Sequence, residues 1–376
     1  MNRIKIVYIV PALMRSGPIN VLCNLLRHLD RTNYEPIIVS LHEPKIRELN
    51  NTDFFLNMGI TVFEFSYSLF EMQFRRKSIA LKIQNQFMDT RVIFHAHGYY
   101  PTLILAEMRE GKTMNTIHNI CDQDFVYRRG GILGKYLANR FKKSLRKLDL
   151  CVVISNSMKE FYNIDRHLNI NVVYNGVELG IQLPSGVKRM DILNQLSIPP
   201  NAKILLYPAP FVNLKNHQYL LETIKFYDRQ DFVILFAGDG STKSYCQKLA
   251  EADTRIRFLG YCMDLEPYWA IADFMISPSL SEGMPLAVLE ALLRGIPPLL
   301  SNIPSHLEIL NNIFGSDSLA FDLNDKYSLD HLFSKVFDMS FDRDKILQRS
   351  KKLYSSVSMC RGYERLYSSF FINKKF

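Results

Sequence analysis

The amino-acid sequence predicts an α/β protein made of two doubly wound, Rossmann-like domains. Its 376 residues exceed what one hydrophobic core usually organises. Short apolar runs rich in β-branched residues alternate with segments of helical spacing, which is the pattern of parallel sheets with crossover helices. We expect residues 1–178 and 179–350 to form the two domains, and residues 351–376 to form a helical segment that packs back on the first.

The alternation starts at the N-terminus. Ile4–Val10 is predicted as a buried strand, apolar residues then recur at helical spacing as far as Leu29, and Ile37–Leu41 is predicted as the next strand. Further strands are predicted at 61–65, 92–95, 113–117, 151–154 and 172–174.

A linker separates the two series. Residues 179–200 contain Leu-Pro-Ser-Gly and Ile-Pro-Pro, which is turn and loop chemistry. Strands of the second series are predicted at 204–207, 233–237, 256–259, 274–276 and 298–300. Because ligands of doubly wound sheets bind outside the carboxyl ends of the strands, two such domains facing each other predict a substrate cleft between them.

Composition limits the class of protein. The chain is 47% hydrophobic and 22% charged, as globular proteins are. No apolar run approaches the roughly 18 to 20 residues of a membrane-spanning helix, and no signal peptide is evident, so we expect a cytoplasmic protein. The 6 cysteines contain no C-x-x-C pair, which favours buried free thiols over disulfides or a zinc cluster.

The net charge of +9 is concentrated in the first half of the chain. Residues 1–178 hold 24 Lys and Arg against 16 Asp and Glu, whereas residues 179–376 hold 22 against 21. This asymmetry predicts an anionic partner for the first half: a phosphate, a membrane surface or a nucleic acid. No RRM, KH or zinc-finger pattern is present and aromatic residues are not interleaved with basic ones, so nucleic acid is not the expected partner.

Residues 281–298 carry the most informative pattern. Pro285 suits the first position of a helix, which leaves Glu282 and Gly283 in the preceding loop. Free N–H groups at such a helix start can bind a phosphate or a sugar hydroxyl. Glu290 falls inside the helix among apolar neighbours, so its carboxylate needs hydrogen-bond donors, which a ribose diol would supply. The alternative is that Glu290 pairs with a local Arg or Lys.

The spacing of this segment is specific. Glu282 and Glu290 form a Glu-x7-Glu pattern, headed by Glu-Gly-x-Pro and followed by Gly-x-Pro at 295–297. It resembles the signature of the retaining GT-B glycosyltransferases of family four, and the resemblance extends over nearly the whole chain. The resemblance implies the GT-B fold, a UDP- or GDP-sugar as donor, a glycan acceptor, and no cofactor or metal.

The resemblance also implies roles for individual residues. Glu282 would hold the hydroxyls of the donor sugar, Glu290 the ribose, Lys215 the diphosphate, and His118 the donor sugar near the reacting centre. For His118, a purely structural imidazole is the alternative. The predicted catalytic residues are Glu282, His118 and Lys215, and the predicted donor site consists of Gly17, Lys215, Gly238, Tyr261, Glu282, Gly283, Met284, Leu286, Ala287 and Glu290.

Turns after the predicted strands fit the resemblance, with one departure. Gly17 stands where the family has a glycine turn that lets the backbone approach a substrate. Gly238 and Tyr261 lie in turns that look like the loops flanking the nucleotide base. The family usually has an arginine five residues before the lysine, and this chain has Pro210 there, so half of the expected cationic diphosphate clamp is absent.

The resemblance implies a mechanism without a metal. Lys215 and the N–H groups of residues 283–287 would stabilise the charge on the leaving diphosphate. The family retains the anomeric configuration by same-face attack, in which the departing phosphate takes the acceptor's proton. Asp-x-Asp triplets, which hold metals in other glycosyltransferases, occur at 122–124 and 342–344, but neither has the expected setting and we do not predict a metal site.

Three other enzyme classes are weighed against this interpretation. A GT-B nucleotide-sugar epimerase would share the fold, and release of free nucleotide only when an acceptor is present would distinguish a transferase from it. A phosphorylase would require a pyridoxal cofactor and a much longer chain. A dehydrogenase would require a G-x-G-x-x-G motif after a strand, of which residues 238–240 are only a fragment.

Residues 125–147 point to the acceptor side. They hold eight Lys and Arg and no Asp or Glu, with an apolar stripe at helical spacing that includes Ile132, Tyr136 and Phe141. A crossover helix with a solvated basic face and a helix on an anionic membrane are equally compatible with this pattern. In the second case the acceptor would be linked to a polyprenyl diphosphate and the enzyme would work at the inner face of the cytoplasmic membrane, in O-antigen or capsule synthesis.

Overall fold

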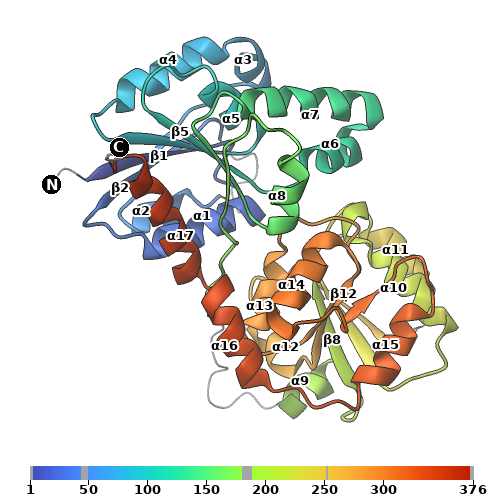
Figure 1. Cartoon of the computed structure of the whole chain (residues 1–376). Helices are drawn as coiled ribbons and strands as arrows, with labels where there is room; N and C mark the ends of the chain where they lie inside the picture. Colours follow the sequence, from blue (N-terminus) through green and yellow to red (C-terminus); the bar gives the residue numbers. More distant parts are fainter. Residues whose placement is uncertain (1–2, 44–49, 180–188, 251–252, 373–376) are drawn as a thin grey trace. The chain divides into compact units, whose positions relative to one another are not determined.

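The computed structural model describes residues 3–43, 50–179, 189–250 and 253–372 (Figure 1). They divide into two compact units, one formed by 1–176 with 356–376 and the other by 177–355. The breaks lie after Gly176 and Ser355, compared with the predicted 178 and 350. Residues 180–188 of the predicted linker 179–200 lie outside the described residues. The linker prediction is wrong for its next part, because Arg189–Gln195 forms the helix α9.

The first unit is built on a parallel sheet of seven strands in the order β3-β2-β1-β4-β5-β6-β7. The chain runs outward from β1 to β3 and then returns to the other side of β1 with β4. The last strand begins two residues before the predicted 172–174 and shares only Val172 with it; the others overlap their predicted positions more fully. Its strands are β1 (Ile4–Val10), β2 (Tyr34–Ser40), β3 (Thr61–Glu64), β4 (Val92–His97), β5 (Lys112–Ile117), β6 (Leu150–Val153) and β7 (Ile170–Val172).

Helices cover both faces of this sheet. α1 packs with α17 on one face, and α4, α5 and α7 follow one another in contact on the other (Figure 1). The apolar stripe of α1 is buried against the sheet, as its 3.6-residue spacing requires. The helices of this unit are α1 (Gly17–His28), α2 (Thr52–Asn57), α3 (Leu69–Phe74), α4 (Arg76–Phe87), α5 (Tyr99–Leu105), α6 (Cys121–Arg129), α7 (Gly131–Leu145), α8 (Asn156–Tyr162) and α17 (Ser356–Ser369).

The C-terminal helix α17 is tied into the first unit by buried hydroxyl groups. The Tyr367 hydroxyl lies 3.0 Å from that of Tyr8 and 2.9 Å from Nδ1 of His95. Nε2 of His95 lies 2.8 Å from the hydroxyl of Thr116, which is 2.9 Å from that of Tyr363. Burial lowers the pKa of His95 to about 3, so the ring is neutral and the network holds no buried charge.

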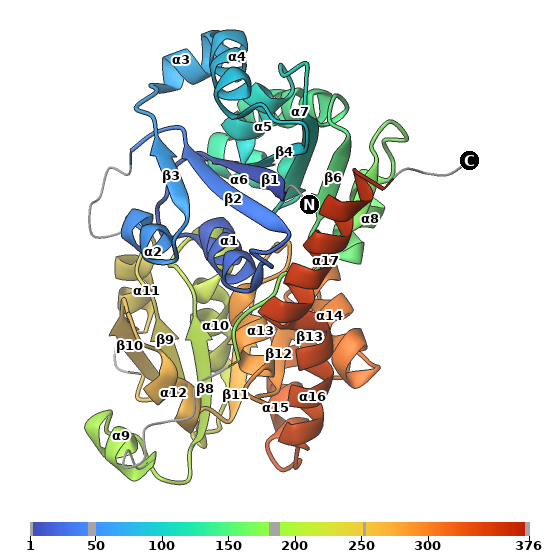
Figure 2. The same ribbon diagram turned by 90° about the vertical axis from the view of Figure 1, so that its left-hand side faces the viewer.

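The second unit is built on a parallel sheet of six strands in the order β10-β9-β8-β11-β12-β13. Five of them overlap predicted strands, and the short β13 was not predicted. Figure 2 shows the strands of this sheet side by side, from β10 to β13. Its strands are β8 (Lys203–Pro208), β9 (Phe232–Ala237), β10 (Ile256–Gly260), β11 (Phe274–Ser277), β12 (Pro298–Ser301) and β13 (Ala320–Phe321).

The second sheet has the same arrangement of crossovers as the first. β8 lies between β9 and β11, so the chain leaves β8 in one direction and later returns to its other side. Two doubly wound domains are therefore confirmed. The helices of this unit are α9 (Arg189–Gln195), η2 (Asn213–Lys215), α10 (His217–Thr223), η3 (Ile224–Phe226), α11 (Lys243–Leu249), α12 (Glu266–Ile271), α13 (Leu286–Leu292), α14 (Pro304–Phe314), α15 (Ser328–Val336) and α16 (Arg343–Tyr354).

Within the described residues, no helix combines the length and the apolar character that crossing a bilayer would need. The longest described helix, α7, has 15 residues and carries several charges.

Candidate functional site

The switch point of the second sheet places two predicted site residues on adjacent loops. Lys215 ends η2, after the loop that follows β8, and Glu282 lies in the loop that follows β11. β8 and β11 pair side by side in parallel, so their carboxyl ends meet at the same edge. Ligands of doubly wound sheets bind at this point, because the two loops diverge there and leave a crevice.

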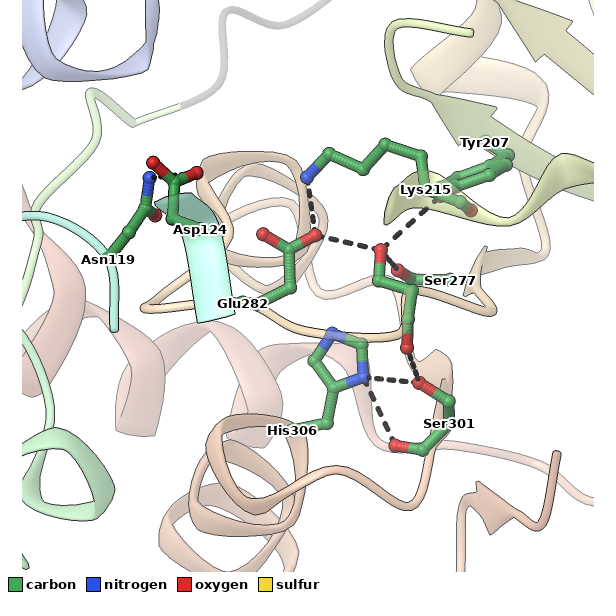
Figure 3. Close-up of polar contacts among 9 residues, drawn as sticks. Asn119, Asp124, Tyr207, Lys215, Ser277, Glu282, Ser301 and His306 are labelled. Atoms are coloured by element: carbon green, nitrogen blue, oxygen red, sulfur yellow. Dashed lines mark hydrogen bonds and ion pairs between the residues drawn. The ribbon is translucent and has the colours of Figure 1, made fainter. Parts of the chain in front are cut away.

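Lys215 and Glu282 form an ion pair, drawn in Figure 3. The same Glu282 oxygen accepts a hydrogen bond of 2.8 Å from the hydroxyl of Ser279. Burial alone would raise the pKa of Glu282, but the adjacent ammonium and the hydrogen bonds outweigh it and hold the pKa below its ordinary value. Glu282 is therefore an ionised hydrogen-bond acceptor at neutral pH, and Lys215 is a cation with an acidic partner.

A second layer of polar groups supports this pair (Figure 3). The Tyr207 hydroxyl donates to the backbone carbonyl of Lys215 at 2.6 Å, which fixes the end of η2. The Ser301 hydroxyl donates to the carbonyl of Ser279 at 2.7 Å and lies 3.1 Å from Nδ1 of His306. These contacts join the ends of β8, β11 and β12, so the loop around Glu282 is held from three strands.

His306 is fully buried and neutral. Burial lowers its pKa to about 4, although the charge of Glu282 acts in the opposite direction. Its Nδ1 has the hydroxyl and carbonyl of Ser301 as neighbours, each at 3.1 Å, whereas Nε2 has no hydrogen-bond partner within the described residues.

Glu290 lies in α13, as predicted, and has a different environment from Glu282. No group of the described residues donates a hydrogen bond to its carboxylate. The nearby Arg294 forms its ion pair with Glu266 and donates to the backbone carbonyl of Glu290 at 2.8 Å. Burial raises the pKa of Glu290 to about 7, against the opposing charge of Arg294. The predicted alternative, a side-chain pair between Glu290 and a local cation, is therefore not what the structure shows.

The start of α13 differs by one residue from the prediction. Pro285 is in an extended conformation and caps the helix, and Leu286 is the first helical residue. Pro285 is therefore the last residue of the loop and not the first residue of the helix. Gly283 and Met284 are buried in the loop, and Leu286 and Ala287 are half-buried in the first turn, where backbone N–H groups have no partner inside a helix.

Gly238 is required by the close approach of two loops. A Cβ at this position would lie 2.0 Å from the carbonyl oxygen of Ala209, so any side chain would clash with backbone. The turn at Gly238 is thus pressed against the segment that holds Pro210, the position at which the family usually has an arginine. Pro210 itself is exposed, and Tyr261, the other residue predicted near the base, is exposed after β10.

The first unit holds the other two predicted residues, near its own switch point. Gly17 is exposed at the start of α1, and a Cβ there would meet no atom within 4 Å. His118 follows β5 and its Nε2 lies 2.9 Å from Nδ1 of His97, the last residue of β4. Burial lowers the pKa of His118 to about 4, so this pair is neutral at pH 7. Nothing in the folded unit itself requires a glycine at position 17.

Both Asp-x-Asp triplets have partners within the chain. Asp122 accepts from Lys142 at 2.8 Å and Asp124 from Arg128 at 2.9 Å. Asp342 caps α16 by accepting from the backbone N–H of Lys345 at 2.9 Å. The described residues contain no cluster of three or more His, Cys, Asp or Glu side chains arranged to hold a metal ion.

Sequence reasoning missed Ser279, Ser301 and His306. Ser279 is part of a Ser-Pro-Ser-Leu-Ser run directly after a predicted strand, which could have indicated polar groups at a strand end. No comparable signal marks Ser301 or His306, because their importance comes from the pairing of β11 with β12.

Two family models match consecutive parts of the chain. The model described as Glycosyltransferase Family 4 matches residues 16–180, in the first unit. The model described as Glycosyl transferases group 1 matches residues 188–352, which contain Lys215, Glu282 and Glu290.

Known proteins resemble the chain along its whole length. The Escherichia coli O-antigen biosynthesis glycosyltransferase WclY is 24% identical over 382 aligned residues, which cover 98% of this chain and 99% of that protein. The Escherichia coli UDP-Gal:alpha-D-GlcNAc-diphosphoundecaprenol alpha-1,3-galactosyltransferase is 29% identical over 204 residues, covering 52% of this chain and 50% of that one. The solved structure of Anabaena HepE in complex with UDP and glucose superimposes with a TM-score of 0.75 at 14% identity, covering 98% of this chain and 100% of that one.

The two matched models, the relatives and the shared architecture agree with the sequence motif around Glu282 and Glu290. This chain belongs to the family four glycosyltransferases of the GT-B fold.

Proposed function

We propose that this glycosyltransferase moves a sugar from a UDP- or GDP-sugar to a glycan acceptor with retention of configuration and without a metal ion. The observation that carries the proposal is the Lys215 and Glu282 pair at the switch point of the second sheet. A cation and an ionised acceptor stand there side by side, where a doubly wound sheet binds its ligand.

The charges of the site suit the two halves of a nucleotide sugar. As the glycosidic bond breaks, negative charge gathers on the diphosphate, and the Lys215 ammonium together with the first N–H groups of α13 would stabilise it. Glu282 accepts hydrogen bonds and would take them from the sugar hydroxyls. Glu290 has no donor of its own within the described residues, so the ribose diol would satisfy it.

Retention follows in this proposal from same-face attack. Glu282 is already engaged by Lys215 and Ser279, which leaves it poorly placed to act as a nucleophile. The departing phosphate would take the proton of the acceptor hydroxyl. The neutral His118 would contact the donor sugar by hydrogen bonding and not by charge.

Metal independence is proposed because protein cations can supply the required positive charge. Activity should persist in excess EDTA, measured as sugar transfer against untreated enzyme. Complete inhibition that Mn²⁺ or Mg²⁺ reverses would overturn this part of the proposal. The Asp122→Asn and Asp124→Asn variants would then show whether that triplet is the metal site.

The acceptor is proposed to be a glycan on a lipid diphosphate, in the synthesis of a cell-surface polysaccharide such as O-antigen. The support is the naming of the relatives: one acts in O-antigen biosynthesis, and another on a GlcNAc joined to diphosphoundecaprenol. We propose that the enzyme works as a peripheral protein at the inner face of the cytoplasmic membrane.

The test has two stages. A thermal-shift screen of nucleotides and nucleotide sugars identifies the donor, because a ligand that binds only the native state raises its stability. The donor is then incubated with and without lipid-linked acceptor. Nucleotide release that depends on the acceptor supports transfer, whereas conversion of the donor into its epimer without acceptor would indicate the epimerase alternative. If none of the nucleotides or nucleotide sugars raises the melting temperature, the result would count against the proposed site.

A further inference from the structure

Two helical segments of the first unit expose large apolar side chains to solvent. The hairpin of α6 and α7 exposes Ile132, Leu133 and Tyr136, of which Ile132 is 93% exposed. The short helix α3 exposes Leu69, Phe70 and Phe74, and Phe74 is 69% exposed. Single exposed apolar residues need no explanation, but two such clusters on one unit of a folded chain do.

The hairpin is a firm protrusion, because glycines shape its turn and its contact. Gly130, between the two helices, has a φ of 80°, which is a conformation that side chains rarely adopt. At Gly134 a Cβ would lie 2.6 Å from the backbone of Val126, so only glycine lets α7 pack this closely on α6. The tip at 127–133 is exposed throughout.

The exposed residues of α7 cannot belong to its packed face. Gly134, Ala138 and Phe141 are buried and follow one another at helical spacing. Ile132 and Tyr136 are four residues apart and lie on the opposite side of the helix. The predicted apolar stripe is therefore divided: its C-terminal part packs in the core and its N-terminal part faces solvent.

The helix α3 presents its apolar residues in the same way. Ser68 and Glu71 form a capping box that fixes the start of the helix. Met72 is buried on the inner side, while the rings of Phe70 and Phe74 contact each other on the outer side, with their centroids 4.7 Å apart and their planes tilted by 42°. The pair is held outward by the same contacts that order the helix.

Both segments lie toward one end of the first sheet. α3 follows the carboxyl end of β3, and α6 follows the carboxyl end of β5 and His118. α3 and α7 both contact α5, which lies between them (Figure 1). The two apolar clusters therefore share the edge at which this sheet would bind its substrate.

Positive charge surrounds both clusters. Arg128, Arg129 and Lys135 are exposed around the hairpin tip, and Arg75 and Lys77 follow α3. The acidic groups nearby are already paired: Asp124 with Arg128 at 2.9 Å, and Glu71 with Arg75 at 3.8 Å. These two pairs also occupy Arg128 and Arg75, so the surplus positive charge is that of Arg129, Lys135 and Lys77, and it matches an anionic surface.

We propose that Leu69, Phe70, Phe74, Ile132, Leu133 and Tyr136 form a docking surface that enters the headgroup region of an anionic bilayer. Convex apolar residues within a ring of Lys and Arg suit a lipid interface, where the apolar groups insert and the cations meet lipid phosphates. The purpose of this surface rests on the proposed lipid-linked acceptor, but its binding to vesicles requires neither donor nor acceptor. Failure to bind vesicles would leave the transfer reaction standing with a soluble acceptor.

The first experiment measures sedimentation with vesicles of phosphatidylcholine containing increasing phosphatidylglycerol. The variant Arg128→Gln, Arg129→Gln, Lys135→Gln should bind about a hundredfold more weakly at low salt, at about a tenfold loss per one to two cations. A matched control removes three exposed lysines of the second unit, Lys225, Lys248 and Lys345, and should bind as wild type does.

The apolar contribution is measured separately. The variant Ile132→Ser, Leu133→Ser, Tyr136→Ser should bind about tenfold more weakly or worse at every salt concentration, because burial of apolar area does not depend on salt. The control replaces Phe226, Tyr327 and Met339 with serine; these large apolar residues of the second unit are 57%, 45% and 50% exposed. Thermal unfolding and donor binding should be unchanged in both sets.

Insertion itself is followed with Ile132→Trp. The chain has one tryptophan, the buried Trp269, so new emission comes from the tip. Anionic vesicles should shift this emission to the blue, and brominated lipids should quench it. Binding that ignores lipid charge and both variants would overturn the proposal. So would a dimer that the tip variants dissociate while vesicles bind no protein, because the surface would then join two copies of the chain.

Discussion

The replacement Glu290→Gln should stabilise the protein while weakening donor binding. The pKa of Glu290 is raised from 4.5 to about 7, so its ionised form is disfavoured in the folded state. The folded state therefore gains free energy of unfolding from the neutral carboxyl. This gain is fully present below about pH 4.5, declines between about pH 4.5 and 7, and is lost above about pH 7. A shift of this size corresponds to about 3 kcal/mol at high pH, and because water reaches part of the half-buried group we expect roughly 2 kcal/mol.

Thermal unfolding across pH 5 to 9 measures this effect. For a unit of about this size, 2 kcal/mol corresponds to a rise in Tm of roughly 4 to 8 °C at pH 8, and about a quarter of that rise is expected at pH 5. The same variant should bind the nucleotide more weakly, and the wild type should bind it better as pH rises through 7, since an ionised carboxylate is the stronger acceptor. Equal Tm values for both proteins at pH 8, or unaltered nucleotide affinity, would refute this account of Glu290.

Further predictions concern four other residues. Lys215→Ala should weaken binding of the nucleoside diphosphate at least about tenfold and leave the nucleoside unaffected, as titration calorimetry would show; equal losses would argue against a diphosphate role. Glu282→Ala should lower kcat more than it raises KM, measured in steady-state transfer, because its proposed partner is the reacting sugar. Gly17→Val should leave Tm within about 2 °C but reduce transfer about tenfold or more, because its Cβ would meet no protein atom; full activity would mean that no substrate approaches there. Gly134→Leu should lower Tm through the clash with α6, and a neutral effect would show that the hairpin is looser than described.

The fold was largely predictable because strand runs in this chain are apolar on both faces. Strands buried in a parallel sheet appear as continuous β-branched runs, such as Ile4–Val10. The strand β13 was not predicted because Ala320–Phe321, with two residues, is too short to show an alternating or apolar pattern. β7 was displaced because its residues are only half-buried and alternate poorly. The place of α17 required knowing which sheet its tyrosines reach, which no local pattern records.

The site was predictable where it depends on sequence neighbours and not where it depends on strand pairing. The spacing of Glu282 and Glu290 is local, and both lie where the pattern indicates. Ser301 and His306 belong to the site only because β12 pairs with β11. The sequence also did not predict that the pKa of Glu282 is lowered and that of Glu290 raised. The ion pair that lowers the pKa of Glu282 joins residues 67 positions apart.

The two ends of the basic segment 125–147 have different environments in the structure. Cations pair with acidic groups along the whole segment: Arg128 with Asp124 at 2.9 Å, Lys142 with Asp122 at 2.8 Å, and Arg146 with Asp165 at 2.7 Å. Lys142, Lys143, Arg146 and Lys147 lie at the far end of α7 from the tip. Lys143, Arg146 and Lys147 are exposed at that end too, so the exposed apolar side chains, and not the cations, distinguish the tip from the rest of the segment.

The return of α17 to the first unit governs the order in which the protein can mature on the ribosome. The second unit is one continuous stretch, 177–355, and is complete before translation ends. The first unit emerges earlier but still lacks its last helix. The Tyr8 hydroxyl can form its hydrogen bond only after Tyr367, 359 residues later in the chain, has been synthesised. Domains usually fold in the order of synthesis. Here the N-terminal unit can be completed only after the second unit has been synthesised, and a chain that stops before Ser356 would lack the tyrosine hydroxyls that hydrogen-bond to Tyr8, His95 and Thr116.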